Sequence, residues 1–250
     1  MKNKTLRSIS LRRDEITNWN THPFSVPVIK SLDDITINSN VVFFIGENGS
    51  GKSTLLEAIA KNFGFSKEGG TRNTQFETNE EDYIAKLADK LKITWTEKLL
   101  TGYFLRAESF FNFASHLDEI KKGPGIDATK TYAPYGGISL HQQSHGQSFM
   151  ALFQNRFYNN GFFLLDEPEA ALSVQKQLTF LAVLNDIIKK YPKAQFIIAT
   201  HSPILLAFPK AQILEFKDGE INETTYENTE IYAVTKNFLN NKQKIFDEIF

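Results

Sequence analysis

Three short runs of hydrophobic residues predict buried β-strands. Residues 41–45 (VVFFI), 161–165 (GFFLL) and 195–200 (QFIIAT) are mostly apolar and rich in β-branched and aromatic side chains. Such runs are typical of strands buried on both faces of a parallel sheet. Hydrophobic residues also recur at helical spacing over 53–63, with a glycine directly after, and over about 173–190. Strands that alternate with helices predict an α/β protein with a mainly parallel central sheet.

The pattern changes in the middle of the chain. Residues 66–80 are polar and contain glycines, and residues 122–137 hold two prolines and four glycines, so we expect a surface loop in each. Between these loops the pattern predicts helices near 81–91 and 109–121 and a strand at 102–106. We therefore expect residues 66–140 to form a mostly helical subdomain, inserted in a single domain that spans residues 1–250.

A hairpin and terminal helices are expected at residues 211–250. Within residues 213–221 an Asp218-Gly219 pair separates two short apolar segments, which favours a β-hairpin. The stretch at 230–250 has the spacing of one or two amphipathic helices.

Composition adds limits to this fold. Of the 250 residues, 41% are hydrophobic and 23% are charged, and no apolar run approaches the roughly 20 residues that cross a bilayer. Cysteine is absent, which excludes disulfides, thiolate metal sites and cysteine nucleophiles. The first fifteen residues lack the apolar segment of a secretion signal, so we expect a cytoplasmic protein with no direct membrane insertion. A net charge of −1 gives no overall attraction to nucleic acid, so we expect the isolated chain to bind DNA only weakly.

One glycine-rich segment carries a specific chemical signal. Residues 46–53 (GENGSGKS) match the phosphate-binding loop pattern GxxxxGK[ST] and lie between a predicted strand and a predicted helix, as that pattern requires. Backbone N–H groups of such a loop surround phosphates, Lys52 is placed to reach the β and γ phosphates, and Ser53 can ligate Mg²⁺. An accidental glycine-rich turn rarely has this context. The candidate nucleotide-binding residues are Gly46, Glu47, Asn48, Gly49, Ser50, Gly51, Lys52, Ser53 and Thr54.

Three polar residues follow the other two buried strands. Asp166 and Glu167 come directly after 161–165, and His201 comes directly after 195–200. Because ligands bind at the carboxyl edge of a parallel sheet, we expect these side chains beside the phosphate loop. There Asp166 can hold Mg²⁺ through water, Glu167 can act as the general base, and His201 can contact the γ-phosphate. Alone, each is more often a solvated strand end or a structural histidine.

Together with the polar segment at 144–148, these motifs resemble the ATP-binding cassette ATPase superfamily. In that family's terms the chain contains a Walker A loop at 46–53, a signature motif at 144–147, a Walker B motif at 162–167, a D-loop at 168–173 and a switch histidine at His201. The resemblance implies ATP and Mg²⁺ as ligands, with Glu167, His201 and Lys52 as catalytic residues. It also implies an ATP-dependent homodimer, in which Ser144, Gly146 and Gln147 of one subunit cover the nucleotide held by the other.

Within the superfamily, GENGSGKST, SHGQS, LDEPEAALS and IIATHSPILLA are most similar to small bacterial ATPases that resemble the RecF, SMC and OLD groups. His145 stands where transporter cassettes usually carry glycine, which weakens the transporter interpretation. The 91 residues from Ser53 to Ser144 leave no room for the long coiled coil of SMC proteins.

Two family positions stay open. Gln75 lies too close to the phosphate loop to be a secure glutamine-loop residue, whereas Glu108 is a candidate there and as an Mg²⁺ ligand, with Arg106 beside it. A surface ion pair of Glu108 and Arg106 is an equal alternative. Trp19 and Phe24 are candidates for stacking on adenine, although core packing explains either residue as well.

The leading hypothesis is an ATP-hydrolysing cassette that drives or switches an unknown effector protein, in DNA maintenance or in defence against invading DNA. A first alternative is the ATPase subunit of a transporter, which needs a separate membrane partner. A second alternative is a non-catalytic nucleotide switch, but the presence of Glu167 and His201 argues against a loss of hydrolysis.

Overall fold

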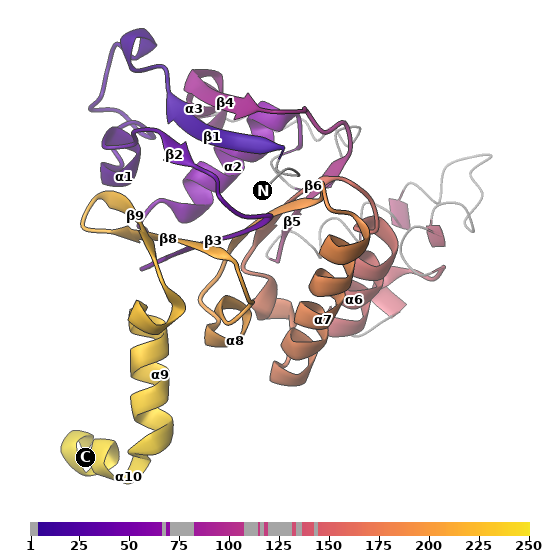
Figure 1. The fold of residues 1–250 in the computed structure, drawn as a ribbon, viewed down its shortest axis with the longest axis vertical. Helices are drawn as coiled ribbons and strands as arrows, with labels where there is room; N and C mark the ends of the chain where they lie inside the picture. The colour runs from indigo at the N-terminus through magenta and orange to yellow at the C-terminus, as the bar shows by residue number, and fades with distance from the viewer. Residues whose placement is uncertain are drawn as a thin grey trace.

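The computed structural model describes most of the chain (Figure 1). The described residues are 5–66, 69–70, 83–107, 115, 118–119, 132–133, 137–142 and 145–250. The helix expected near 109–121 and the loops expected at 66–80 and 122–137 fall largely outside them. Among the residues that the structure describes, no helix is both long enough and apolar enough to cross a membrane.

A six-stranded sheet forms the centre of the molecule. Its strands lie in the order β5-β6-β7-β3-β8-β9, and every neighbouring pair is parallel except β8 and β9. The strands are β3 (Val41–Gly46), β5 (Gly102–Arg106), β6 (Phe162–Asp166), β7 (Gln195–Ala199), β8 (Gln212–Lys217) and β9 (Glu220–Thr224). The predicted α/β fold with a mainly parallel sheet is therefore confirmed, together with the strands expected at 41–45, 102–106, 161–165 and 195–200.

Hydrophobic side chains of this sheet enter two separate cores. In β3, Val42 and Phe44 belong to one core, and Phe43 and Ile45 belong to the other, because successive side chains of a strand point to opposite faces. The runs of apolar residues are thus continuous because both faces of the sheet are covered.

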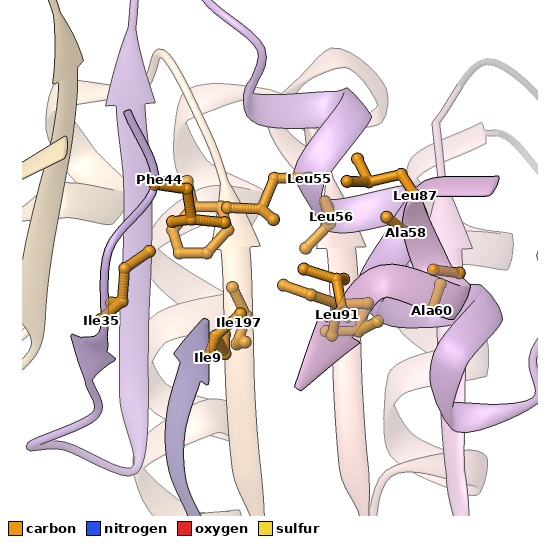
Figure 2. Packing of buried hydrophobic residues seen from close by; sticks show 14 of the residues in the cluster. Ile9, Ile35, Phe44, Leu55, Leu56, Ala58, Ala60, Leu87, Leu91 and Ile197 are labelled. Atoms are coloured by element: carbon orange, nitrogen blue, oxygen red, sulfur yellow. The ribbon is translucent and has the colours of Figure 1, made fainter. Parts of the chain in front are cut away.

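Helices cover each face of the sheet (Figure 1). One core lies against α2 (Lys52–Phe63) and α3 (Tyr83–Lys90), and Figure 2 shows Phe44 facing Leu55 and Leu56 of α2. The other core lies against α6 (His145–Arg156), α7 (Val174–Lys190) and α8 (Pro203–Leu206). The helices predicted over 53–63 and 173–190 are confirmed as α2 and α7. The structure also contains α1 (Pro27–Lys30) and 3-10 turns at Arg13–Glu15, Leu140–Gln142, Pro168–Ala171 and Tyr226–Asn228.

A second, three-stranded antiparallel sheet was not predicted from the sequence. It contains β1 (Leu6–Leu11), β2 (Ile35–Thr36) and β4 (Leu91–Trp95) in the order β2-β1-β4. In β1, apolar Leu6, Ile9 and Leu11 are mixed with arginine and serine, and β2 has two residues, so no strand has a long apolar run. The described part of the range 66–140 thus includes strands of both sheets, β4 and β5, and the limits of an inserted subdomain stay a prediction.

The C-terminal region has the predicted hairpin and two helices. Asp218 and Gly219 connect β8 and β9 with φ values of 52° and 81°, as a tight two-residue hairpin turn requires. Beyond it, α9 (Glu230–Asn240) extends away from the sheet and α10 (Lys242–Ile249) lies at its far end (Figure 1).

Two buried glutamines join the large sheet to β1 and to the segment around β2 in the small sheet. Gln195, at the start of β7, is fully buried, and its Oε1 accepts hydrogen bonds from the Leu6 N–H at 2.8 Å and the Thr5 hydroxyl at 2.9 Å. Gln212, at the start of β8, accepts from the Asn38 N–H at 2.7 Å and donates to the Thr36 carbonyl at 2.9 Å. Each side-chain amide therefore forms hydrogen bonds with backbone groups in or next to the small sheet.

Replacing Gln195 with leucine should lower the free energy of unfolding by about 1–3 kcal/mol, because the Leu6 N–H and the Thr5 hydroxyl lose their buried acceptor. Urea unfolding measures this change. The matched control is Gln175→Leu on the exposed side of α7, which should change stability by less than about 0.5 kcal/mol. Equal stability of the Gln195→Leu variant and the wild type would contradict the role of Gln195 in joining β1 to the large sheet.

Candidate functional site

The phosphate loop connects the end of β3 to the start of α2, as predicted. Gly46, Gly49 and Gly51 have positive φ values of 143°, 79° and 100°. At Gly46 a Cβ atom would lie 2.4 Å from the carbonyl oxygen of Phe216, so this position requires glycine sterically as well. The loop can therefore pass close to β8 and turn its N–H groups toward a bound anion.

Lys52 lies across the loop. Its ammonium group donates hydrogen bonds to the carbonyls of Gly46 and Glu47, each at 2.8 Å, and the residue is buried. Burial lowers the pKa of Lys52 from its ordinary value, and the neighbouring carboxylates, Glu167 first among them, act in the opposite direction. From this position the Lys52 ammonium group can transfer its hydrogen bonds to the phosphate oxygens of a ligand without a movement of the backbone.

Ser53 and Asp166 together offer oxygen atoms suited to Mg²⁺. The Ser53 hydroxyl donates to Asp166 Oδ1 at 3.1 Å, and the aspartate is buried at the end of β6. Both residues line a cavity of about 200 Å³, which Arg106 and Glu167 also line. Hydroxyl and carboxylate oxygens are the ligands that Mg²⁺ prefers, and a small cavity leaves space for its water ligands. The residues present therefore fit this cation.

Glu167 lies at the turn that follows β6. Its φ value of 50° is unusual for a residue other than glycine, and its N–H donates to the Ala199 carbonyl of β7 at 2.9 Å. Strained backbone of this kind is concentrated at functional sites. The carboxylate is 44% exposed, so water can reach it, and its Oε1 lies 3.6 Å from His201 Nε2.

His201 is held at the same edge by β7 and by Glu169. Its backbone N–H donates to Glu169 Oε1. Burial lowers the pKa of the His201 imidazole from its ordinary value, Lys52 lowers it further, and Glu167 opposes both effects. Since the ordinary value is 6.5, the imidazole is mainly neutral at neutral pH.

The structure thus brings together the phosphate loop, Asp166, Glu167 and His201, as predicted from three separate segments. The candidate signature residues Gly146 and Gln147 do not line either of the two cavities beside the phosphate loop. Gly146 and Gln147 are in the first turn of α6, where a Cβ on Gly146 would lie 2.7 Å from Lys176 Cδ. Their contact with a nucleotide of another subunit stays a prediction, as does that of Ser144, which is outside the described residues.

Two site residues were missed or left open by the sequence. Glu169 contacts His201 through a backbone hydrogen bond, which no local sequence signal reveals. The Arg106 side chain is 17% exposed and lies within ion-pair distance of Glu57 and Asp166, two contacts that were not predicted. The alternatives for Glu108 and Gln75 concern residues outside the described part of the chain.

The two candidates for adenine stacking do not line the cavity beside the phosphate loop. Phe24 is in the core, and Trp19 packs edge-on against it at 6.2 Å with the Arg13 guanidinium 4.5 Å over its ring. The cavity itself, of about 560 Å³, lies between the loop, the β8–β9 hairpin and the start of α9. This participation of α9 was not predicted.

Comparison with known proteins gives one family match. A family model described as "ABC transporter" matches residues 34–170, which is more than half of the chain and includes the phosphate loop, Asp166 and Glu167. The search of curated proteins found no match.

Several solved structures are similar to the chain. One is cbiO1 from Clostridium perfringens, part of the ABC transporter complex cbiONQ, with 16% identity, coverage of 88% of this chain and 91% of that chain, and a TM-score of 0.48. Another is a dimeric bacterial ABC transporter cassette, with 18% identity, coverage of 79% and 90%, and a TM-score of 0.43. The same values hold for that cassette in a post-hydrolysis state with ADP and Pi.

Glu169 provides a test of the electrostatics of this edge. Burial raises the pKa of Glu169 above its ordinary value of 4.5, although the hydrogen bond from His201 opposes the shift. The folded state therefore favours the protonated form, and the stability that this form contributes is lost as the pH rises above 4.5 through the folded pKa. Glu169→Gln keeps a neutral side chain, so its free energy of unfolding should exceed that of the wild type increasingly between pH 4.5 and pH 7. Urea titrations at several pH values measure this.

The exposed Glu248→Gln substitution in α10 serves as the control and should give no such gain at neutral pH. A Glu169→Gln variant that is less stable than the wild type at pH 7 would show that the carboxylate stabilises the edge as an anion.

Proposed function

Because this chain belongs to the ABC transporter family and has the α/β P-loop fold of its ATPases, which bind ATP with Mg²⁺, we propose that it hydrolyses ATP. The observation that carries the proposal is the convergence of Lys52, Asp166 and Glu167 at one edge of the sheet. These side chains supply a cation for phosphates, an oxygen ligand for Mg²⁺ and a base for water.

The chain's own residues divide the work of this reaction. Backbone N–H groups of the phosphate loop and Lys52 would hold the triphosphate, and Ser53 and Asp166 would hold Mg²⁺. When bound there, Mg²⁺ would supply positive charge against the phosphate oxygens. Glu167, which is open to water, accepts a proton from the attacking water, and the neutral His201 beside it donates or accepts a hydrogen bond at the γ-phosphate end.

A composite site explains why one chain leaves the phosphate loop open. In the proposed homodimer, Ser144, Gly146 and Gln147 of each subunit close the nucleotide site of the other. The exposed Glu167 and the open face of the loop then become enclosed, which excludes bulk water from the reaction.

For the process that ATP hydrolysis drives, the family description supports the ATPase subunit of a transporter, paired with a separate membrane protein. The comparisons do not support a role in DNA maintenance, and the closer resemblance to the RecF, SMC and OLD groups is not confirmed by them. A cytoplasmic location follows from the proposed subunit role.

Replacing Glu167 with glutamine should preserve ATP binding and lower the hydrolysis rate by about 100-fold or more, because the shape remains and the base is lost. The ATP-bound dimer should then accumulate, which size-exclusion chromatography with ATP and Mg²⁺ measures. Lys52→Ala is the control for binding and should form no such dimer. Adding Ser144→Arg to Glu167→Gln should abolish dimerisation if the signature residue covers the partner's nucleotide.

A monomeric Glu167→Gln variant that hydrolyses ATP at the wild-type rate would contradict both the base and the closure. A stable ATP-bound dimer of the double variant would remove only the assignment of Ser144.

The Glu167→Gln dimer should also capture the transport partner. With ATP and Mg²⁺, it should retain an integral membrane protein from detergent-solubilised native membranes, whereas Lys52→Ala should retain none. Mass spectrometry of the captured proteins measures this. Capture of a DNA-processing enzyme in place of a membrane protein would contradict the transporter role.

A further inference from the structure

Arg106 is half-buried at the end of β5, next to the candidate Mg²⁺ ligands. It is the cross-strand neighbour of Asp166 in the parallel pair of β5 and β6. Its side chain is 17% exposed and lines the same 200 Å³ cavity as Ser53 and Asp166. The proposed reaction gives this arginine no part, so its place beside the ligands has to be explained.

The guanidinium group connects two elements. Its Nη1 lies 3.2 Å from Glu57 Oε1 on α2, and its Nε lies 3.7 Å from Asp166 Oδ2 on β6. Both carboxylates are nearly buried, with side chains 11% and 8% exposed. Glu57 follows Ser53 by four residues, so the two lie on one face of α2, one turn apart.

The two oxygens of Asp166 therefore have different neighbours. Oδ1 accepts a hydrogen bond from the Ser53 hydroxyl at 3.1 Å, and Oδ2 lies beside Arg106. We propose that Arg106 is a positioning residue for Mg²⁺, which holds the Asp166 carboxylate and helix α2 so that Asp166 Oδ1 and Ser53 Oγ face the same cation. This inference rests on the proposed function, because it concerns the Mg²⁺ that accompanies ATP.

A planar guanidinium suits this task better than an ammonium group does. Arginine presents several N–H donors in a fixed fork, so one side chain can contact two carboxylates at once, whereas lysine offers one compact charge. With Arg106 in place, Glu57 and Asp166 share a counter-charge, and the ion pair at 3.7 Å favours the orientation in which Asp166 Oδ2 faces Arg106. Groups that orient metal ligands in this way typically change metal affinity by 10–100-fold when they are altered.

The test is Arg106→Lys, measured by the binding of a fluorescent ATP analogue at increasing Mg²⁺ concentration and again in EDTA. The expected result is a rise of about tenfold in the Mg²⁺ concentration for half-maximal binding, with unchanged affinity in EDTA. Arg13→Lys is the matched control, since Arg13 donates to the Lys30 carbonyl far from this cavity, and it should bind as the wild type does.

An unchanged Mg²⁺ midpoint in Arg106→Lys would overturn the inference. An equal loss of binding with and without Mg²⁺ would also overturn it, because Arg106 would then act on the nucleotide or on folding alone. If Arg106→Lys does not fold, Glu57→Gln replaces it in the test, because this substitution removes the charge that Arg106 contacts on α2. Glu57→Gln should also raise the Mg²⁺ midpoint. An unchanged midpoint in this variant would overturn the inference.

A wild-type chain that binds no nucleotide under any condition would overturn the proposed function itself, and the inference with it. That result concerns the unaltered protein and is therefore distinct from a failure seen in Arg106→Lys alone.

Discussion

Parallel pairing of β3, β7 and β6 is the constraint on which the candidate site depends. Because all three strands run in the same direction, the residues that follow them emerge at one edge, although the phosphate loop lies more than 100 positions before Asp166 in the chain. The N–H of Glu167 bonds to the Ala199 carbonyl and the N–H of Thr200 bonds to the Phe44 carbonyl, so the register continues past the strand ends. A slip of one residue in this pairing would turn Asp166 into the core and separate it from Ser53.

The same edge gathers charges that must balance one another. Lys52 and Arg106 lie among the carboxylates of Asp166, Glu167 and Glu169, and most of these groups have lost part of their water. Buried charges are tolerated only when they are paired or hydrogen-bonded. Arg106 and Lys52 therefore belong to one electrostatic arrangement, in which Arg106 pairs with Glu57 and Asp166 and Lys52 interacts with Glu167, Asp166 and Glu169.

The sequence predicts the central sheet well, because residues such as Val42 and Phe44 belong to runs that are apolar at every position and have no competing interpretation. The phosphate loop and the residues after β6 and β7 were predicted for a related reason, since strand, loop and helix follow directly along the chain. By contrast, β1 was missed because half of its residues are polar, and its stability comes from contacts with β4 and Gln195. The contacts of Arg106 with Glu57 and of Glu169 with His201 join distant residues, and only the folded chain shows them.

The hydrogen bonds that Lys52 makes to its own loop also reduce the net free energy that an anion gains by binding there. A ligand that binds in the loop has to replace two good bonds, to the carbonyls of Gly46 and Glu47, before it gains anything from the ammonium group. A small anion with one or two charges, such as orthophosphate or sulfate, compensates this loss less well than a polyphosphate chain, which brings more oxygens and a higher charge to the same place. We therefore expect the loop to favour polyphosphates over free orthophosphate and sulfate, because every anion competes with the carbonyls of Gly46 and Glu47 for the Lys52 ammonium group.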